Sequence, residues 1–285
     1  MASRQISAGL ALGIAIAGPA GAIDLPDIPH EFYRLDNGLE VILHEDHSTP
    51  IVGVNIWYHV GSKNERPGRS GFAHLFEHMM FQGSEHHDSE FFEPLQSVGG
   101  RLNGSTSEDR TNYWEIVPAN HLERALMLEA DRMGWLLPAM TQEKLDNQRD
   151  VVRNERRQSE GWPYSVFWLN FNENFYPEGH PYDHSVIGSH EDLEKASVDD
   201  VKEFFRTYYA PNNATLSIAG DFDPDQVKSW VEKYFAEIPP GEPIEEVDVW
   251  IPELNHEKRI RSEDDVQLTR LYYCWHSPPY YHEGD

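Results

Sequence analysis

Alternating and continuous apolar runs along the first part of the chain predict β-strands. Phe32 to Leu35 and Leu39 to His44 flank the tripeptide Asp36-Asn37-Gly38. An Asn-Gly pair between two apolar runs is a strong hairpin signal, because both residues tolerate positive φ angles. Further runs rich in β-branched and aromatic residues predict strands at 51–60, 101–105, 111–117 and 214–219.

A different spacing, typical of helices, separates these strands. Between Arg69 and Phe81 the apolar residues recur every three or four positions, which predicts an amphipathic helix. Longer periodic segments predict a helix at 120–137 that ends before Pro138, and another that begins after a capping Thr141 and reaches Glu160. Shorter helices are expected at about 89–98, 167–175, 198–209 and 224–235.

Strands and long helices that occupy separate stretches of the chain are typical of an α+β fold. We therefore expect a mainly antiparallel β-sheet packed against long α-helices, formed by residues 23–240. Residues 241–256 are rich in Pro and Glu and are expected to be a linker. Apolar runs at 259–261 and 266–275 predict strands of a second, similar domain that begins near residue 257. That domain is not completed by residue 285, so we expect a truncated gene product or a fragment.

The first 22 residues are typical of a secretory signal peptide. Arg4 provides a positive charge, residues 6–17 are apolar, and Ala20-Gly21-Ala22 has the small residues of a cleavage site. The apolar run is shorter than the roughly 20 residues that a membrane-spanning helix needs. We therefore expect a periplasmic or secreted protein.

Composition narrows the range of functions further. The formal net charge of −26 argues against a nucleic-acid partner, because binding of phosphates requires clustered Lys and Arg. The chain has one cysteine, Cys274, so it cannot form an intramolecular disulfide. The apolar neighbours of Cys274 predict a buried structural thiol.

The run His74-Leu75-Phe76-Glu77-His78 carries the clearest chemistry. Histidines four residues apart on a helix project from one face, where two imidazoles can bind one Zn²⁺. Glu77 lies between them, near enough to accept a proton from a zinc-bound water that attacks a carbonyl. The order His-x-x-Glu-His is the inverted form of the better known zinc motif and predicts a metallopeptidase.

A catalytic zinc requires a third protein ligand, and the local sequence does not identify it. Glu129, Asp131 and Glu155 are all carboxylates on predicted helices, and Glu155 is only slightly favoured because it shares a helical stripe with apolar residues. A second pair of histidines, His180 and His184, is also four residues apart. Pro181 lies between them and breaks a helix, so this pair is expected to lie in a loop rather than bind metal.

These residues resemble the pitrilysin/insulysin family of zinc peptidases, which includes the mitochondrial processing peptidases. The resemblance covers about residues 32–285 and depends on five segments: 71–81, 104–107 with 111–113, 151–157, His180-Pro181-Tyr182, and 209–213. It implies that His74, His78 and Glu155 bind one Zn²⁺ and that Glu77 is the general base. It also implies that Asn103 and Gly104 lie on an edge strand to which the substrate adds as a further β-strand.

Two departures from the family pattern bear on function. Family members often have a second acidic residue at the position of Gln148, and a neutral amide there is expected to reduce zinc affinity. Family enzymes also close two similar halves around the substrate, so we expect this chain to need a second homologous domain or a partner chain. The resemblance therefore predicts a zinc-dependent endopeptidase that hydrolyses peptides or unfolded polypeptide segments. The alternative is a non-catalytic structural or assembly subunit of the same fold.

Overall fold

A computed structural model describes residues 28–280 and residue 282, and within them six strands form one sheet. The strands are β1 (Glu31–Arg34), β2 (Glu40–Glu45), β3 (Ile51–Tyr58), β4 (Arg101–Thr106), β5 (Thr111–Pro118) and β6 (Ala214–Gly220). Their order is β1-β2-β6-β3-β5-β4, and every pair is antiparallel except β2 with β6. The sheet is therefore mainly antiparallel, as expected, and β4 forms one of its edges.

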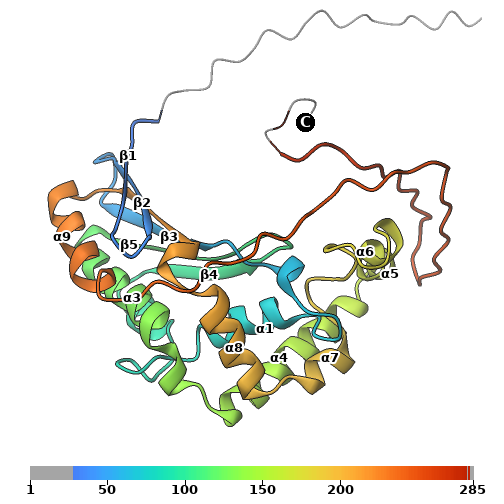
Figure 1. The fold of residues 1–285 in the computed structure, drawn as a ribbon, viewed down its shortest axis with the longest axis horizontal. Helices are drawn as coiled ribbons and strands as arrows, with labels where there is room; N and C mark the ends of the chain where they lie inside the picture. Colours follow the sequence, from blue (N-terminus) through green and yellow to red (C-terminus); the bar gives the residue numbers. More distant parts are fainter. Residues whose placement is uncertain (1–27, 281, 283–285) are drawn as a thin grey trace, which may run out of the picture.

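Most of the helices lie on one side of this sheet, while α5 (Ser165–Leu169) and α6 (Phe171–Phe175) lie beyond one end of it (Figure 1). The other helices are α1 (Phe72–Met79), α2 (Glu93–Gln96), α3 (Leu122–Ala139), α4 (Gln142–Glu160), α7 (His190–Lys195), α8 (Val198–Tyr208) and α9 (Pro224–Phe235). Short 3-10 helices cover Ser62–Asn64, Ala119–His121 and Pro211–Asn213. The α+β fold class predicted from the sequence is confirmed.

Alternation along the central strand β3 shows where the core lies. Val52, Val54, Ile56 and Tyr58 are buried against the helices, because successive side chains of a strand point to opposite faces. On the other face of the same strand Trp57 is exposed. The sheet thus has one closed face, covered by helices, and one open face.

Most predicted boundaries agree with the structure within a few residues, and the exceptions have physical causes. The helix expected at 89–98 is reduced to one turn, Glu93–Gln96, between loop segments. The segment expected as one helix at 167–175 divides into α5 and α6 at Asn170, which has φ −108° and ψ 7°. Pro138 does not stop α3 before it, since the helix continues to Ala139 beyond a kink at Trp135.

The expectations for the last part of the chain differ most from the structure. Residues 236–280, all of which are described, contain no helix or strand, so the strands expected at 259–261 and 266–275 are not formed. A β-strand requires a hydrogen-bonded neighbour, and no strand of the sheet pairs with this segment. Cys274 is exposed rather than buried, which corrects the expected structural thiol. Figure 1 shows the segment as an extended chain that runs past α5 and α6.

The predicted signal peptide, residues 1–22, lies outside the described residues. Among the residues that are described, no helix is both long and apolar enough to cross a membrane.

Candidate metal centre

The helix α1 places the two motif histidines on one side. It begins after Gly71, which has a φ of 87°, and its apolar side chains enter the core. The buried residues of that face are Phe72, Ala73, Leu75, Phe76 and Met79. His74 and His78 are only partly buried, with side chains 19% and 18% exposed, and their rings lie 4.9 Å apart between centroids.

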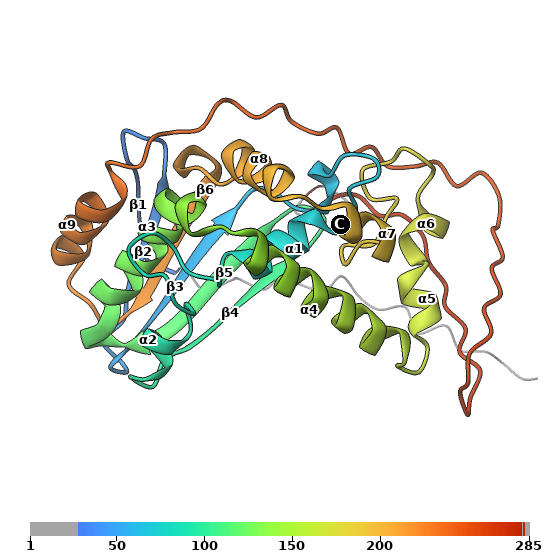
Figure 2. The same cartoon turned by 90° about the horizontal axis from the view of Figure 1, so that it is seen from below.

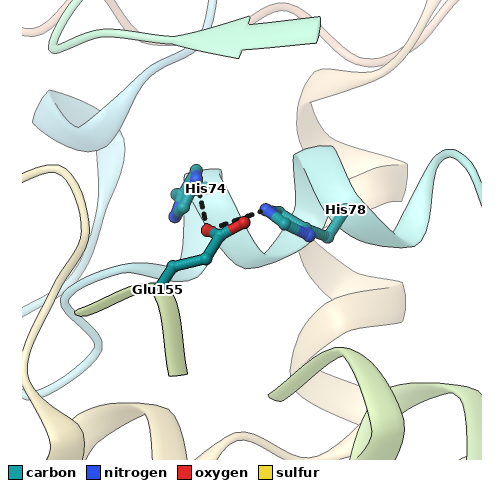
Figure 3. A group of neighbouring side chains, drawn as sticks. All are labelled: His74, His78 and Glu155. Carbon is teal, nitrogen blue, oxygen red and sulfur yellow. Dashed lines mark ion pairs between the residues drawn. The ribbon is translucent and has the colours of Figure 1, made fainter. Parts of the chain in front are cut away.

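Glu155 reaches these histidines from α4, which packs alongside α1 (Figure 2). Its Oε2 atom lies 3.8 Å from His74 Nε2 and 3.4 Å from His78 Nε2, and the three side chains converge on one point (Figure 3). One ligand atom from each residue lies within 4.8 Å of the others. Ligands about 2.0–2.1 Å from a tetrahedral Zn²⁺ are separated by about 3.4 Å, and the two distances from Glu155 are close to this value.

The structure gives other partners to the two carboxylates that competed with Glu155. Glu129 is fully buried and accepts a hydrogen bond of 2.8 Å from Arg132 Nε. Asp131 lies 2.5 Å from His86 Nδ1 and accepts a hydrogen bond from the Ser84 hydroxyl. Of the three candidates left open by the sequence, only Glu155 meets the histidine pair.

Neighbouring groups influence which ring nitrogens face the cluster. His78 Nδ1 lies 3.3 Å from the side-chain oxygen of buried Gln148. Because this oxygen is an acceptor, it favours the tautomer with the proton on Nδ1, which leaves Nε2 to face Glu155. His74 Nδ1 is buried and has no hydrogen-bond partner among the described residues. Burial and the neighbouring His78 lower the pKa of His74 to about 4, so its imidazole is neutral at pH 7, the form that binds a metal. The donor set and its burial therefore fit a bound cation.

Glu77 projects from α1 toward the edge strand β4. Its carboxylate is 8% exposed and accepts a hydrogen bond at Oε2 from the Thr106 hydroxyl. A Cβ built on Gly104 would lie 2.9 Å from Glu77 Oε1. Burial raises the pKa of Glu77, and the hydrogen bond from Thr106 opposes that rise. The side chain thus lies between the histidine pair and the edge of the sheet.

The edge strand carries Gly104 beside this carboxylate, with Asn103 next to it in sequence. Asn103 is exposed, and its side-chain oxygen accepts a 2.9 Å hydrogen bond from the backbone N–H of Gly104. On its inner side β4 pairs with β5, with Gly104 opposite Tyr113. No other strand of the described chain pairs with the outer side of β4.

The second pair of histidines, His180 and His184, has structural contacts. His180 is buried in a loop and its Nε2 lies 2.8 Å from the backbone oxygen of Trp250. His184 lies 3.0 Å from Glu65 and 3.2 Å from Asp183, and it is not part of the cluster that His74, His78 and Glu155 form. The expectation that residues 180–184 form a loop is confirmed.

Sequence reasoning did not identify two residues beside the centre. Thr106, which hydrogen-bonds Glu77, belongs to the segment 104–107 that carries the family resemblance, so a signal was present. Glu65 accepts hydrogen bonds from the backbone N–H groups of Gly71 and Ala73 at the start of α1. No local pattern marks Glu65, because the contact arises only when the loop before α1 folds back.

Comparisons with known proteins identify the family. Residues 40–181 match the family model described as "Insulinase (Peptidase family M16)", and residues 195–285 match the one described as "Peptidase M16 inactive domain". The zinc protease PqqE of Helicobacter pylori is 33% identical over 209 residues, which cover 72% of this chain and 46% of that protein. The chain spans about half the length of the first curated relatives that it matches.

Solved structures show the same relationship. The crystal structure of a protease from Helicobacter pylori superposes with a TM-score of 0.71 and 31% sequence identity, covering 79% of this chain and 53% of that chain. The periplasmic protease PqqL from Escherichia coli has the same fold, with a TM-score of 0.72 at 23% identity over 81% of this chain and 26% of that chain. The predicted relationship to the pitrilysin/insulysin peptidases is confirmed, and the chain belongs to peptidase family M16.

Proposed function

We propose that this chain is the metal-binding half of a zinc-dependent endopeptidase, with His74, His78 and Glu155 as ligands and Glu77 as general base. The convergence of two imidazoles and one carboxylate within 4.8 Å carries the proposal. Two His and one Glu form a known catalytic zinc set that leaves a fourth position open. A zinc ion in such a site polarises the scissile carbonyl and acidifies water.

The residues of the chain would divide the remaining work. Glu77 accepts the proton of the attacking water, and its hydrogen bond with Thr106 fixes the carboxylate while Oε1 stays free of that contact. Asn103 and Gly104 bind the substrate as an added strand along β4. A peptide carbonyl can replace the Asn103 side chain as the acceptor for the Gly104 N–H. Such backbone pairing binds peptides with little dependence on their sequence.

The whole protein is proposed to act on peptides or unfolded segments in the periplasm or outside the cell, after removal of residues 1–22. The helix-free face of the sheet is open, and a second homologous domain or partner chain would close a chamber over it. Residues 257–285 are proposed to begin that domain after a linker at 241–256. PqqL of Escherichia coli, which has the same fold, is a periplasmic protease, and this supports the proposed compartment.

The alternative function is a non-catalytic subunit of the same fold. The match of residues 195–285 to the inactive-domain model favours it for that part of the chain. Against it, the full set of His74, Glu77, His78 and Glu155 is present on the first part, and burying such a polar cluster is costly without a use.

Cleavage of a quenched fluorescent peptide mixture tests the proposal, with zinc content measured on the same samples. We expect Glu77→Gln to keep its zinc and lose about 10²–10⁴-fold in cleavage rate, the usual contribution of a general base. Glu123→Gln, on the exposed side of α3, is the matched control and should behave as wild type. Stoichiometric zinc without cleavage by wild type would mean that this half needs the second domain or partner chain, whereas a folded wild type with neither zinc nor cleavage would favour the non-catalytic subunit.

A further inference from the structure

The metal helix α1 has no side-chain cap of its own. Its N-cap residue is Gly71, which has no side chain to accept hydrogen bonds from the free N–H groups of the first turn. Glu65 takes this role from six residues earlier, because its carboxylate accepts from Gly71 N at 2.9 Å and from Ala73 N at 2.7 Å. A carboxylate at a helix N-terminus also interacts favourably with the helix dipole.

Glu65 is itself held by a residue distant in sequence. Its side chain is 1% exposed, and its Oε2 lies 3.0 Å from His184 Nε2. Burial disfavours a charged ring, but the hydrogen bonds to Glu65 and Asp183 outweigh it and raise the pKa of His184 to about 9. At neutral pH His184 is therefore a cation, and its hydrogen bond opposes the rise that burial causes in the pKa of Glu65.

The loop that carries His184 is tied to the surrounding structure on several sides. Asp183 lies 3.2 Å from His184 Nδ1 and accepts from Gly179 N at 2.7 Å. Tyr182 donates to Asp109, in the turn between β4 and β5, at 2.6 Å. The loop therefore connects the start of the metal helix with the hairpin that contains the edge strand.

We propose that Glu65 and His184 are positioning residues of the metal centre, which fix the first turn of α1 so that His74 meets His78 and Glu155. This inference rests on the proposed function. Ala73, whose N–H Glu65 binds, directly precedes His74, so a shift of the first turn moves that ligand. With only eight residues, α1 has few internal hydrogen bonds to resist such a shift.

Zinc affinity of the full chain, measured against a competing chelator, tests the proposal without reference to cleavage. We expect Glu65→Gln and His184→Leu each to weaken zinc binding by about 10–100-fold, as for outer groups that orient metal ligands. The d–d absorption of the cobalt-substituted protein should change in both variants, because the geometry around the ion changes. His184→Gln keeps a donor toward Glu65 and should restore most of the affinity.

Asp223→Ala is the matched control, because it removes a helix cap of α9 at the far end of the sheet (Figure 1). It should lower the melting temperature and leave zinc affinity and the cobalt spectrum unchanged. Wild-type affinity and spectrum in folded His184→Leu would overturn the proposal, and this variant decides the matter if Glu65→Gln does not fold. Absence of metal binding in wild type would overturn the proposed function and this inference together, whereas unaffected variants would overturn the inference alone.

Discussion

Gly104 lies so close to Glu77 that a side chain added at Gly104 would displace the Glu77 carboxylate. A Cβ on Gly104 would approach Glu77 Oε1 to 2.9 Å and Glu77 Cγ to 3.1 Å. The φ of Gly104 is not in the left-handed region, so the close approach and not the backbone conformation accounts for glycine here. The edge strand and the proposed base are therefore in direct contact.

We expect Gly104→Ala to lower the rate of peptide cleavage by about tenfold or more while zinc content stays the same. The new methyl group displaces the Glu77 carboxylate, and small misplacements of a reacting group are costly in rate. Steady-state kinetics with a fluorescent peptide, together with metal analysis, measures both quantities. Gly53→Ala on β3 is the matched control, since its Cβ would meet only Ala219 O at 3.8 Å. Equal losses in the two variants would show that the contact with Glu77 is irrelevant.

A second expectation concerns Gln148, the neutral neighbour of His78. Its side-chain oxygen lies 3.3 Å from His78 Nδ1, so Gln148→Glu places a charged acceptor on that nitrogen. A carboxylate makes the imidazole a more basic ligand, and we expect zinc affinity to rise by about tenfold. Titration with a chelator measures the change. Asn147→Asp adds the same charge on the exposed side of α4, and an equal rise in that variant would indicate a general electrostatic effect instead.

Sequence periodicity predicted the sheet and the main helices because each buries one face. It could not choose the proposed third metal ligand, since Glu129, Asp131 and Glu155 are all carboxylates on helices. The structure distinguishes them through contacts between distant segments: Arg132 pairs with Glu129, and Ser84 and His86 bind Asp131. The helical stripe favoured Glu155 only slightly, and the family resemblance implied it as the ligand.

The errors of the sequence reasoning have a common origin in tertiary context. Segments 259–261 and 266–275 have strand-like composition. They do not form strands, because no neighbouring strand pairs with them. Glu65 and His184 lie 119 positions apart and carry no local motif, so their contact could not be expected from the chain. Burial of Arg132 was missed for the same reason.

Arg132 provides a third expectation, on stability. Its guanidinium is fully buried, hydrogen-bonds Glu129, and lies 4.1 Å from the Phe91 ring centroid and 4.2 Å from that of Tyr113. Arg132→Met leaves the Glu129 carboxylate buried without its partner, and we expect a loss of about 3–5 kcal/mol in the free energy of unfolding. Urea unfolding followed by circular dichroism measures the change.

The double variant Arg132→Met/Glu129→Leu separates lost charge pairing from lost packing. Replacing a buried pair by apolar residues of similar size is often close to neutral, so the double variant should be more stable than the single one. Burial and the neighbouring Glu129 raise the pKa of Glu115 in the same cluster, so removal of Glu129 also relieves that carboxyl group. A double variant no more stable than Arg132→Met would contradict the electrostatic explanation.

The contact between His184 and Glu65 makes stability depend on pH in a definite direction. The folded-state pKa of His184, about 9, exceeds its ordinary value of 6.5, because Glu65 and Asp183 stabilise the charged ring against the effect of burial. A group with a raised folded-state pKa contributes stability that is complete below its unfolded pKa and is lost as the pH rises through the folded one. The contribution is therefore present near pH 6.5 and absent above about pH 9.

At about 1.4 kcal/mol per pKa unit, the contribution of His184 is about 3 kcal/mol. We expect wild type to be more stable than His184→Leu by roughly this amount at pH 6.5, and the difference to shrink steadily between pH 6.5 and 9.5. Urea unfolding of both proteins across this range measures it. Asp223→Ala, whose cap involves no histidine, should differ from wild type by the same amount at each pH. A difference between wild type and His184→Leu that stays constant with pH would mean that His184 is neutral in the folded protein and binds Glu65 only as an uncharged donor.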